Sequence, residues 1–251
     1  MTSEFIDRGR EYKVPCLYKI EGREKIVCII VHGFGSSKES VTANMMFQEL
    51  PVRGIGAFAF DFPAHGDSEV EGEYLLVSNC VKDLADAEAR ARELAPEAEI
   101  VFLASSFGAL VTLIYLSGLK KGKPRAFLRS AAVSMPRLFR ERQTPEQNAS
   151  LKAAGEFIRD KAAYGYIRDL KITQNFIDDL ESCDVFTLWR EAYAKLCMIH
   201  GELDETIPLG DAGSFAGKFN VPLTVVPGGD HQLSIPGAPE RVLKLALEFF
   251  A

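Results

Sequence analysis

Residues 100–110 read IVFLASSFGAL, and this stretch decides the fold. Its first five residues are apolar and β-prone, as expected of a buried strand, and a segment of helical periodicity follows at 108–119. The sharp turn between such a strand and helix is a typical position for an exposed serine nucleophile. The turn requires small residues two positions before and two positions after that serine. Ala104 and Gly108 meet this requirement around Ser106, which we therefore predict to be the nucleophile.

The neighbouring Ser105 fits the turn less well. With Ser105 as nucleophile, Leu103 and Phe107 would occupy the two positions that must be small, and the turn would be crowded. Ser106 is therefore preferred, although this short pattern also occurs often by chance. The rest of the chain has to supply the partners that a serine nucleophile needs.

The wider pattern predicts an α/β fold. Apolar, strand-length runs recur along the chain, at residues 26–31, 55–60, 126–133, 196–199 and 223–226. Segments of helical periodicity lie between or after them, at residues 77–94, 211–219 and 239–249. Strands that alternate with helices favour a mostly parallel central sheet with helices on both faces. An earlier run at 13–20, joined to 26–31 by a turn-like Glu-Gly-Arg-Glu, predicts an antiparallel hairpin that opens the sheet.

The stretch 135–189 breaks this alternation. It is polar and helical at first and then carries the tyrosine-rich piece AAYGYIRDL. We expect residues 1–134 and 190–251 to form the core. Residues 135–189, called the lid segment below, are expected to be a short insertion that packs over one end of the sheet. One more helix–strand pair of the core remains the alternative.

A serine hydroxyl needs a general base, and the chain has only four histidines. His32 and His65 precede the serine, whereas in a sheet of this kind the base follows it. His200 ends a predicted strand and is interpreted as structural. His231 lies in the glycine-rich loop PGGDHQLS between the last strand and the final helix, where it could reach the carboxyl edge of the sheet. We therefore predict that His231 is the base.

The base needs a carboxylate to orient it, and Asp204 in HGELDETIP is the best candidate. It follows the strand at 196–199 and precedes Pro208, which places it on a loop at the carboxyl end of the sheet. Four other carboxylates are weaker candidates. Glu202 and Glu205 resemble exposed loop charges, Asp230 adjoins His231 too closely, and Asp184 precedes the strand.

The oxyanion of a tetrahedral intermediate needs preorganised donors, which backbone N–H groups usually supply. One is expected from Phe107, the residue after the nucleophile. The second is expected from Phe34 in the loop HGFGSS at 32–37, where two glycines allow the backbone to approach a ligand. A simple glycine turn is the alternative for this loop.

Composition excludes several other classes of protein. The net charge of −6 argues against a nucleic-acid surface, and no apolar run reaches the roughly 18 residues of a membrane span. The first residues lack the apolar core of a secretory signal, so a cytoplasmic location is expected. The cysteines show no CxxC spacing and no metal-ligand cluster is visible, so neither a metal nor an organic cofactor is expected.

Five motifs together resemble the α/β-hydrolase superfamily. In chain order they are HGFGSSK, DFPAHGDS, ASSFGA, HGELDETIP and GGDHQLS, and the resemblance spans about residues 26–250 apart from the lid segment. Within the superfamily the chain is similar to compact bacterial serine esterases of the cinnamoyl or feruloyl esterase and monoacylglycerol lipase kind. Phe107 and Ala104 stand where feruloyl-type members commonly have Gln and Gly. In such relatives the residues that correspond to Asp61 and Gly66 are structural.

The resemblance implies a serine esterase that cleaves small carboxylic esters through a Ser106–His231–Asp204 triad and an acyl-enzyme. Thioesterase, amidase, peptidase and acyltransferase activity use the same triad, and a non-catalytic binding member of the fold is a further alternative. A homodimer is left open. We expect the substrate to be selected by apolar residues of the lid segment, namely Leu138, Phe139, Tyr164, Tyr166 and Ile167.

Overall fold

A computed structural model describes residues 1–119, 122–191 and 193–251. Its centre is an eight-stranded sheet, in which the second strand of the chain pairs antiparallel with both of its neighbours and all the other pairings are parallel. In spatial order the strands are β1 (Thr2–Ile6), β2 (Val14–Lys19), β4 (Ile55–Phe60), β3 (Ile26–Val31), β5 (Glu99–Ser105), β6 (Arg125–Arg129), β9 (Lys195–Gly201) and β10 (Leu223–Val226). This is the α/β-hydrolase fold that the sequence predicts.

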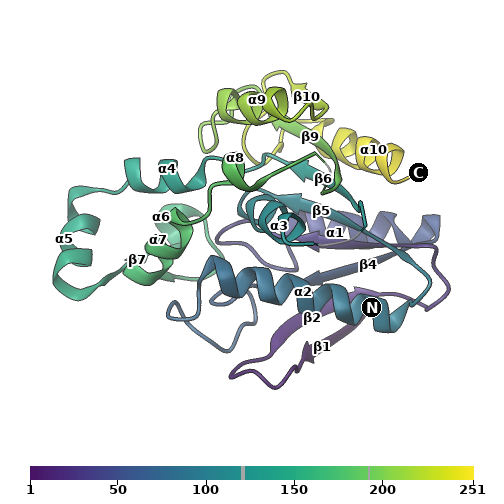
Figure 1. Cartoon of the computed structure of the whole chain (residues 1–251), viewed down its shortest axis with the longest axis horizontal. Helices are drawn as coiled ribbons and strands as arrows, with labels where there is room; N and C mark the ends of the chain where they lie inside the picture. The colour runs from purple at the N-terminus through teal and green to yellow at the C-terminus, as the bar shows by residue number, and fades with distance from the viewer. Residues whose placement is uncertain (120–121, 192) are drawn as a thin grey trace.

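Helices cover both faces of the sheet, as Figure 1 shows, with α2 and α3 in front of the strands and α1 behind them. The core helices are α1 (Val41–Glu49), η1 (Pro51–Arg53), α2 (Val77–Leu94), α3 (Phe107–Ser117), α9 (Leu209–Lys218) and α10 (Ala238–Phe250). Because side chains of a strand alternate between faces, Ile29 packs in the cluster beneath α2 and α3 while Ile30 packs beneath α1 and α10. The sheet is therefore buried on both sides.

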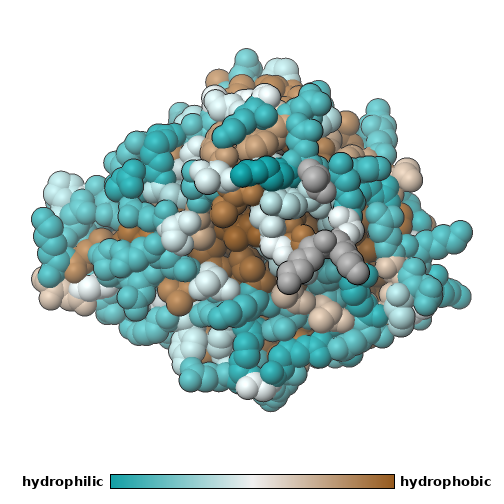
Figure 2. All heavy atoms as spheres, viewed as in Figure 1, coloured by the Kyte–Doolittle hydropathy of each residue, from teal (hydrophilic) through white to brown (hydrophobic). Residues whose placement is uncertain are grey.

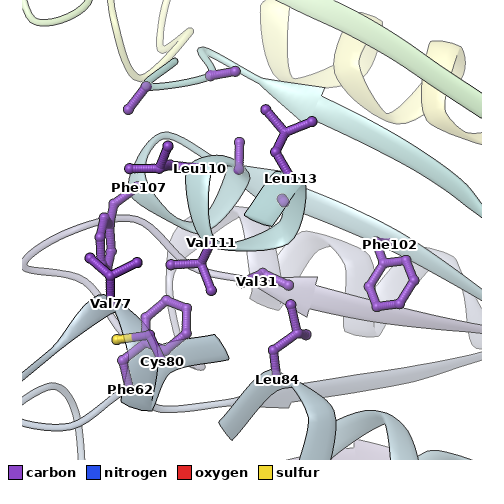
Figure 3. Packing of buried hydrophobic residues seen from close by; sticks show 14 of the residues in the cluster. Val31, Phe62, Val77, Cys80, Leu84, Phe102, Phe107, Leu110, Val111 and Leu113 are labelled. Carbon is purple, nitrogen blue, oxygen red and sulfur yellow. The ribbon is translucent and has the colours of Figure 1, made fainter. Parts of the chain in front are cut away.

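The helix after Ser106 is held by a dense apolar cluster. Val111 of α3 lies on the side that faces Cys80 and Leu84 of α2, whereas Leu110 and Leu113 point to the other side of the helix (Figure 3), and all five are fully buried. An 11-residue helix buried on most of its surface cannot shift without opening cavities, which cost several kcal/mol each. The packing thus fixes the helix whose first residue adjoins Ser106.

The predicted hairpin between residues 13–20 and 26–31 is wrong. β2 pairs antiparallel with β1 and β4, whereas β3 lies between β4 and β5 and pairs parallel with both. Both edges of β3 are therefore occupied by parallel ladders, which suits a strand whose side chains are buried on both faces. The turn after Ile20 reverses the chain but places β3 on the far side of β4, so β2 and β3 are not neighbours. β1 was not predicted, and β6 ends at Arg129, earlier than the predicted run at 126–133.

The lid segment projects beyond one end of the sheet, at the left of Figure 1. It contains α4 (Met135–Glu141), α5 (Pro145–Ala154), β7 (Glu156–Arg159), α6 (Lys161–Tyr164), β8 (Leu170–Thr173), α7 (Gln174–Glu181) and α8 (Val185–Leu188). Within the part of the chain that the structure describes, β7 and β8 pair only with each other, so the segment adds no strand to the central sheet.

The molecular surface in Figure 2 is mainly hydrophilic on the face that carries α2 and α3, with a hydrophobic area near its centre. That area lies near α3 in the view of Figure 1. None of the helices in the described residues combines the length and the hydrophobicity that a bilayer crossing would need.

Candidate active site

Ser106 lies on the tight turn between β5 and α3 and has the strained backbone that such a turn requires. Its φ of 51° and ψ of −117° lie in a region that non-glycine residues rarely adopt. Gly108 packs directly on the end of β3: a Cβ there would lie 2.4 Å from the carbonyl oxygen of His32 and 2.6 Å from that of Val31. Ala104 is fully buried. The two positions that the sequence analysis required to be small are thus sterically restricted in the structure.

The structure separates the two adjacent serines. Ser105 is buried, and its Oγ accepts a hydrogen bond from Arg129 Nε at 3.0 Å. Ser106 Oγ lies 3.0 Å from Nε2 of His231. Only Ser106 of the two has a base within hydrogen-bonding distance.

His231 and Asp204 complete a hydrogen-bonded chain with Ser106. Nδ1 of His231 donates to Oδ2 of Asp204 at 2.7 Å, which leaves Nε2 free to accept the serine proton. The other carboxylate oxygen of Asp204 accepts from the backbone N–H groups of Thr206 at 2.9 Å and Ile207 at 2.8 Å. These bonds fix both the position of the carboxylate and the tautomer of His231.

The rival carboxylates have other partners. Asp230 accepts from the backbone and hydroxyl of Ser234, Glu202 accepts from the backbone of Gly228, and Asp184 caps α8. Glu205 is exposed. Of the five candidates, only Asp204 reaches the His231 ring within the described residues.

Asp204 also contacts His200, which the sequence analysis interpreted only as a structural end to a strand. His200 is fully buried, and its Nε2 lies 3.1 Å from Asp204 Oδ2 and 2.8 Å from the carbonyl oxygen of Ile207. Burial works to raise the pKa of Asp204, but the hydrogen bonds from His200 and His231 outweigh it and hold that pKa well below its usual value. The only hint in the sequence was the position of His200 at the end of β9, four residues before Asp204.

The loop after β3 approaches the nucleophile closely. A Cβ added to Gly33 would lie 3.2 Å from Ser106 Cβ and 3.9 Å from its Oγ, so the backbone itself faces the serine. Among the turn and loop hydrogen bonds of the described residues, neither the Phe34 nor the Phe107 amide has an acceptor. The two amides that are expected to bind an oxyanion therefore have no competing acceptor among these bonds.

Two buried histidines hold this loop in place. Nε2 of His65 accepts from the Gly35 amide at 2.9 Å, and Nε2 of His32 accepts from the Phe62 amide at 3.1 Å. Burial lowers the pKa of His32 to about 4 and that of His65 to about 3, so both rings are neutral at pH 7. They act as fixed acceptors of backbone hydrogen bonds.

A buried ion pair supports the same loop. The carboxylate of Asp61 accepts from both the backbone amide and Nζ of Lys38, at 2.7 and 2.8 Å. A Cβ on Gly66 would lie 2.3 Å from that carboxylate, so only glycine fits there. Asp61 and Gly66 therefore have structural positions, in line with the resemblance.

Ser106 and His231 open into a cavity of about 700 Å³ between the core and the lid segment. All five lid residues singled out in the sequence line it: Leu138, Phe139, Tyr164, Tyr166 and Ile167. Tyr166 covers the loop after β3, because a Cβ on Gly35 would lie 2.0 Å from its ring. The backbone N–H of Ile167 also donates to the Gly35 carbonyl at 3.1 Å. The lid segment thus rests on the loop that faces the nucleophile.

Sequence reasoning missed three arginines in the cavity wall: Arg129, Arg142 and Arg159. Arg129 holds the loop that carries the base, since its Nη1 donates to the carbonyl oxygens of Gln232 at 2.7 Å and His231 at 3.3 Å. Burial lowers the pKa of Arg129 to about 10.

Among the described residues, no group of three or more His, Cys, Asp or Glu side chains is placed to hold a metal ion.

Comparison with known proteins identifies the family. A family model described as the alpha/beta hydrolase family matches residues 28–245. No curated protein has a sequence significantly similar to this one.

Several solved structures share the fold over nearly their whole length. A putative hydrolase from Agrobacterium vitis S4 has a TM-score of 0.84 at 19% identity, covering 100% of this chain and 98% of its own. Est1E from Butyrivibrio proteoclasticus, solved with ferulic acid bound, has a TM-score of 0.81 at 18% identity, covering 98% and 99%. An esterase from Pyrococcus furiosus has a TM-score of 0.71 at 21% identity, covering 99% and 89%.

Proposed function

Because the chain belongs to the alpha/beta hydrolase family, we propose that it is a serine esterase that hydrolyses small carboxylic esters. The observation that carries the proposal is the hydrogen-bonded chain from Ser106 Oγ through His231 to Asp204. Its support is the strained turn that presents Ser106 together with the free backbone donors beside it. This arrangement suits acyl transfer.

In the first step Ser106 Oγ attacks the ester carbonyl carbon while its proton passes to Nε2 of His231. Asp204 stabilises the imidazolium that forms. The negative charge that develops on the carbonyl oxygen is stabilised by the amides of Phe34 and Phe107. Collapse of the tetrahedral intermediate breaks the bond to the alcohol oxygen, which takes the proton from His231 and leaves as the alcohol.

In the second step a water molecule attacks the acyl-enzyme. His231 accepts a proton from this water and then returns it to Ser106 Oγ as the acid is released. The enzyme is regenerated with one water consumed, and the chemistry uses only groups of this chain.

We assign substrate selection to the lid segment, residues 135–189, acting on a core formed by 1–134 and 190–251. The five apolar and aromatic lid residues face the cavity and would contact the parts of the ester away from the reacting carbonyl. Est1E was solved with ferulic acid, so a feruloyl ester is a reasonable member of any substrate panel.

The test is the hydrolysis of p-nitrophenyl esters from acetate to decanoate, together with methyl ferulate, by the native protein and by Ser106→Ala. We expect turnover by the native protein and a loss of at least about 10⁴-fold in kcat for the variant. Ser105→Ala is the matched control, because it removes the adjacent hydroxyl that has no base; it should keep activity within about tenfold.

Labelling with a fluorophosphonate probe separates the remaining outcomes. If Ser106 reacts with the probe but no ester is turned over, the triad is active on thioesters, amides or an acyl acceptor other than water, and the ester assignment fails. If Ser106 does not react, the chain is a non-catalytic member of the fold.

A further inference from the structure

Arg159, at the end of β7 in the lid segment, holds its guanidinium among aromatic rings. The guanidinium carbon lies 4.1 Å from the ring centre of Phe139, 5.1 Å from that of Tyr164 and 5.9 Å from that of Phe34. Its Nη1 also donates to the hydroxyl of Tyr166 at 3.4 Å. Cation–π contacts of this kind hold the planar group in one orientation, so it is preorganised.

Within the part of the chain that the structure describes, this cation has no carboxylate partner. Nε of Arg159 is buried and has no hydrogen-bond acceptor. The guanidinium donates from Nη1 to Tyr166, and its Nη2 is more accessible than Nε and has no acceptor among the described residues. No acidic side chain of the described residues comes within 4.0 Å of the guanidinium, whereas Arg140 and Arg168 of the same segment pair with Glu181 and Glu71. A half-buried guanidinium that lacks an acceptor is costly, and this cost is recovered if a ligand supplies one.

The cavity as a whole favours an anion. Its wall contains Arg129, Arg142 and Arg159, and its only acidic side chain among the described residues is Glu39, which is exposed. This contrasts with a chain whose net charge is −6. Because the cavity is partly shielded from water, an anion inside it feels these positive charges more strongly than it would at the surface.

Arg159 is also close enough to the chemistry to act on substrate. Phe34, one of the rings that it contacts, belongs to the loop that faces Ser106, and Arg159 lines the same cavity as Ser106 and His231. We propose that Arg159 binds a carboxylate of the substrate, so that the preferred esters carry a negative charge on their acyl or alcohol part. The planar fork of a guanidinium matches the two oxygens of a carboxylate. This inference rests on the proposed function.

The acyl arm of the test compares mono-p-nitrophenyl glutarate with p-nitrophenyl valerate, which has the same chain length but no charge. We expect the native protein to prefer the glutarate. Arg159→Gln should lower kcat/KM for the glutarate about 10- to 100-fold, mainly through KM, and change that for the valerate less than about threefold. The neutral ester thus reports whether the variant is still folded.

The alcohol arm compares 3-butyryloxypropanoate with butyl butyrate, with acid release followed by titration at constant pH. The arm in which Arg159→Gln removes the preference identifies the part of the substrate that carries the charge. Arg159→Lys should restore part of the preference, because it keeps the charge but loses the fork. Arg140→Gln is the matched control, since it removes a lid arginine that pairs with Glu181 outside the cavity wall.

Binding to Ser106→Ala separates this inference from the proposed function. Monomethyl glutarate should bind that variant in calorimetry, and adding Arg159→Gln should abolish the binding. If esters are hydrolysed but Arg159→Gln changes charged and neutral substrates equally in both arms, the anion site is wrong and the esterase stands. If no ester is hydrolysed yet binding depends on Arg159, the anion site stands and the esterase fails.

Discussion

The core and the lid segment of this molecule are held in place by different interactions. Ser106, His231 and Asp204 lie at the carboxyl edge of a sheet whose strands are buried on both faces, and each is fixed by several hydrogen bonds. The lid segment shares part of this packing through buried residues such as Phe176 and Leu180 of α7. Its helix α5, in contrast, has no buried residue, and the ion pair of Arg140 with Glu181 lies at the surface. We therefore expect the core to fix the geometry of the catalytic residues and the outer part of the lid to make contacts that adapt to the substrate.

This division predicts how substitutions should act. A change at the carboxyl edge of the core should alter the rate of every substrate together or the stability of the whole molecule. A change among the lid residues outside this buried packing should alter the ratio between substrates with little effect on stability, because such residues make few of the contacts that fix the sheet.

The largest expected effect is that of Asp204→Asn. An amide has only one acceptor oxygen, and the backbone N–H groups of Thr206 and Ile207 hold it. The NH2 group then faces Nδ1 of His231 and donates to it, so the imidazole loses its tautomer and its charge partner. We expect kcat to fall about 10⁴-fold, equivalent to about 5.5 kcal/mol of transition-state stabilisation, for all esters alike. Steady-state kinetics across the ester panel measures this.

Asp230→Asn is the matched control, since Asp230 adjoins His231 in the sequence but bonds to Ser234. It should keep kcat within about tenfold. Equal losses in the two variants would contradict the assignment of Asp204 as the acid.

Gly108→Ala should cause the largest loss of stability. The added Cβ would overlap backbone oxygens of His32 and Val31, which cannot move without shifting β3 against α3. We expect the free energy of unfolding to fall by about 3 kcal/mol or more, measured by urea titration.

A lid glycine gives the contrast. Gly155, at the end of α5, also has a positive φ, of 74°, but nothing lies within 4 Å of the position of a Cβ. Gly155→Ala should therefore cost only about 1 kcal/mol. A comparable loss in both variants would show that the core and lid are not distinguished by packing in the way we argue.

The buried histidines of the core predict how stability depends on pH. His32 and His65 have folded pKa values of about 4 and 3, below the usual value for histidine, so on unfolding near pH 5 each takes up a proton. Burial raises the pKa of Asp83 to about 6, so this group releases a proton on unfolding in the same range. The net uptake of one proton means that stability falls by about 1.4 kcal/mol for each unit of pH from 6 to 4.

Urea titrations at several pH values measure this slope. Asp83→Asn removes the opposing group and should steepen it to about 2.7 kcal/mol for each unit. A stability that stays level or increases as the pH falls from 6 to 4 would contradict the neutral state of the two histidines.

Much of the core could be predicted from its sequence because local constraints there are strong. The elbow at Ser106 needs small neighbours, and the loops that carry Asp204 and His231 follow recognisable apolar strands. The hairpin prediction failed because apolar character does not determine which edge of a strand is paired; β3 took two parallel neighbours, and β2 paired with β1 and β4.

The contacts between distant segments could not be predicted. Arg159 meets Phe34 across 125 positions of sequence, and no local pattern marks an arginine that will lack a carboxylate. The contact of His200 with Asp204 likewise depends on how the loop after β9 folds back on its own strand. The prediction that the five lid residues line the cavity rests on their position in the lid segment, which says nothing of their partners.

The smallest expected effect, and the one that tests the lid directly, is that of Tyr166→Ala. The Tyr166 ring covers Gly35 and stacks on Tyr164 with ring centres 5.4 Å apart, so its removal enlarges the cavity next to the loop that faces Ser106. We expect the ratio of kcat/KM for p-nitrophenyl decanoate to that for p-nitrophenyl acetate to rise about tenfold, because longer chains gain apolar contact that acetate cannot use.

Tyr74→Ala is the control, because Tyr74 lies outside the cavity wall and its hydroxyl donates to Glu11; this variant should leave the ratio unchanged. If instead Tyr166→Ala lowers the rates of all esters by one common factor, the lid supports the catalytic geometry itself, and the separation between core and lid has to be abandoned.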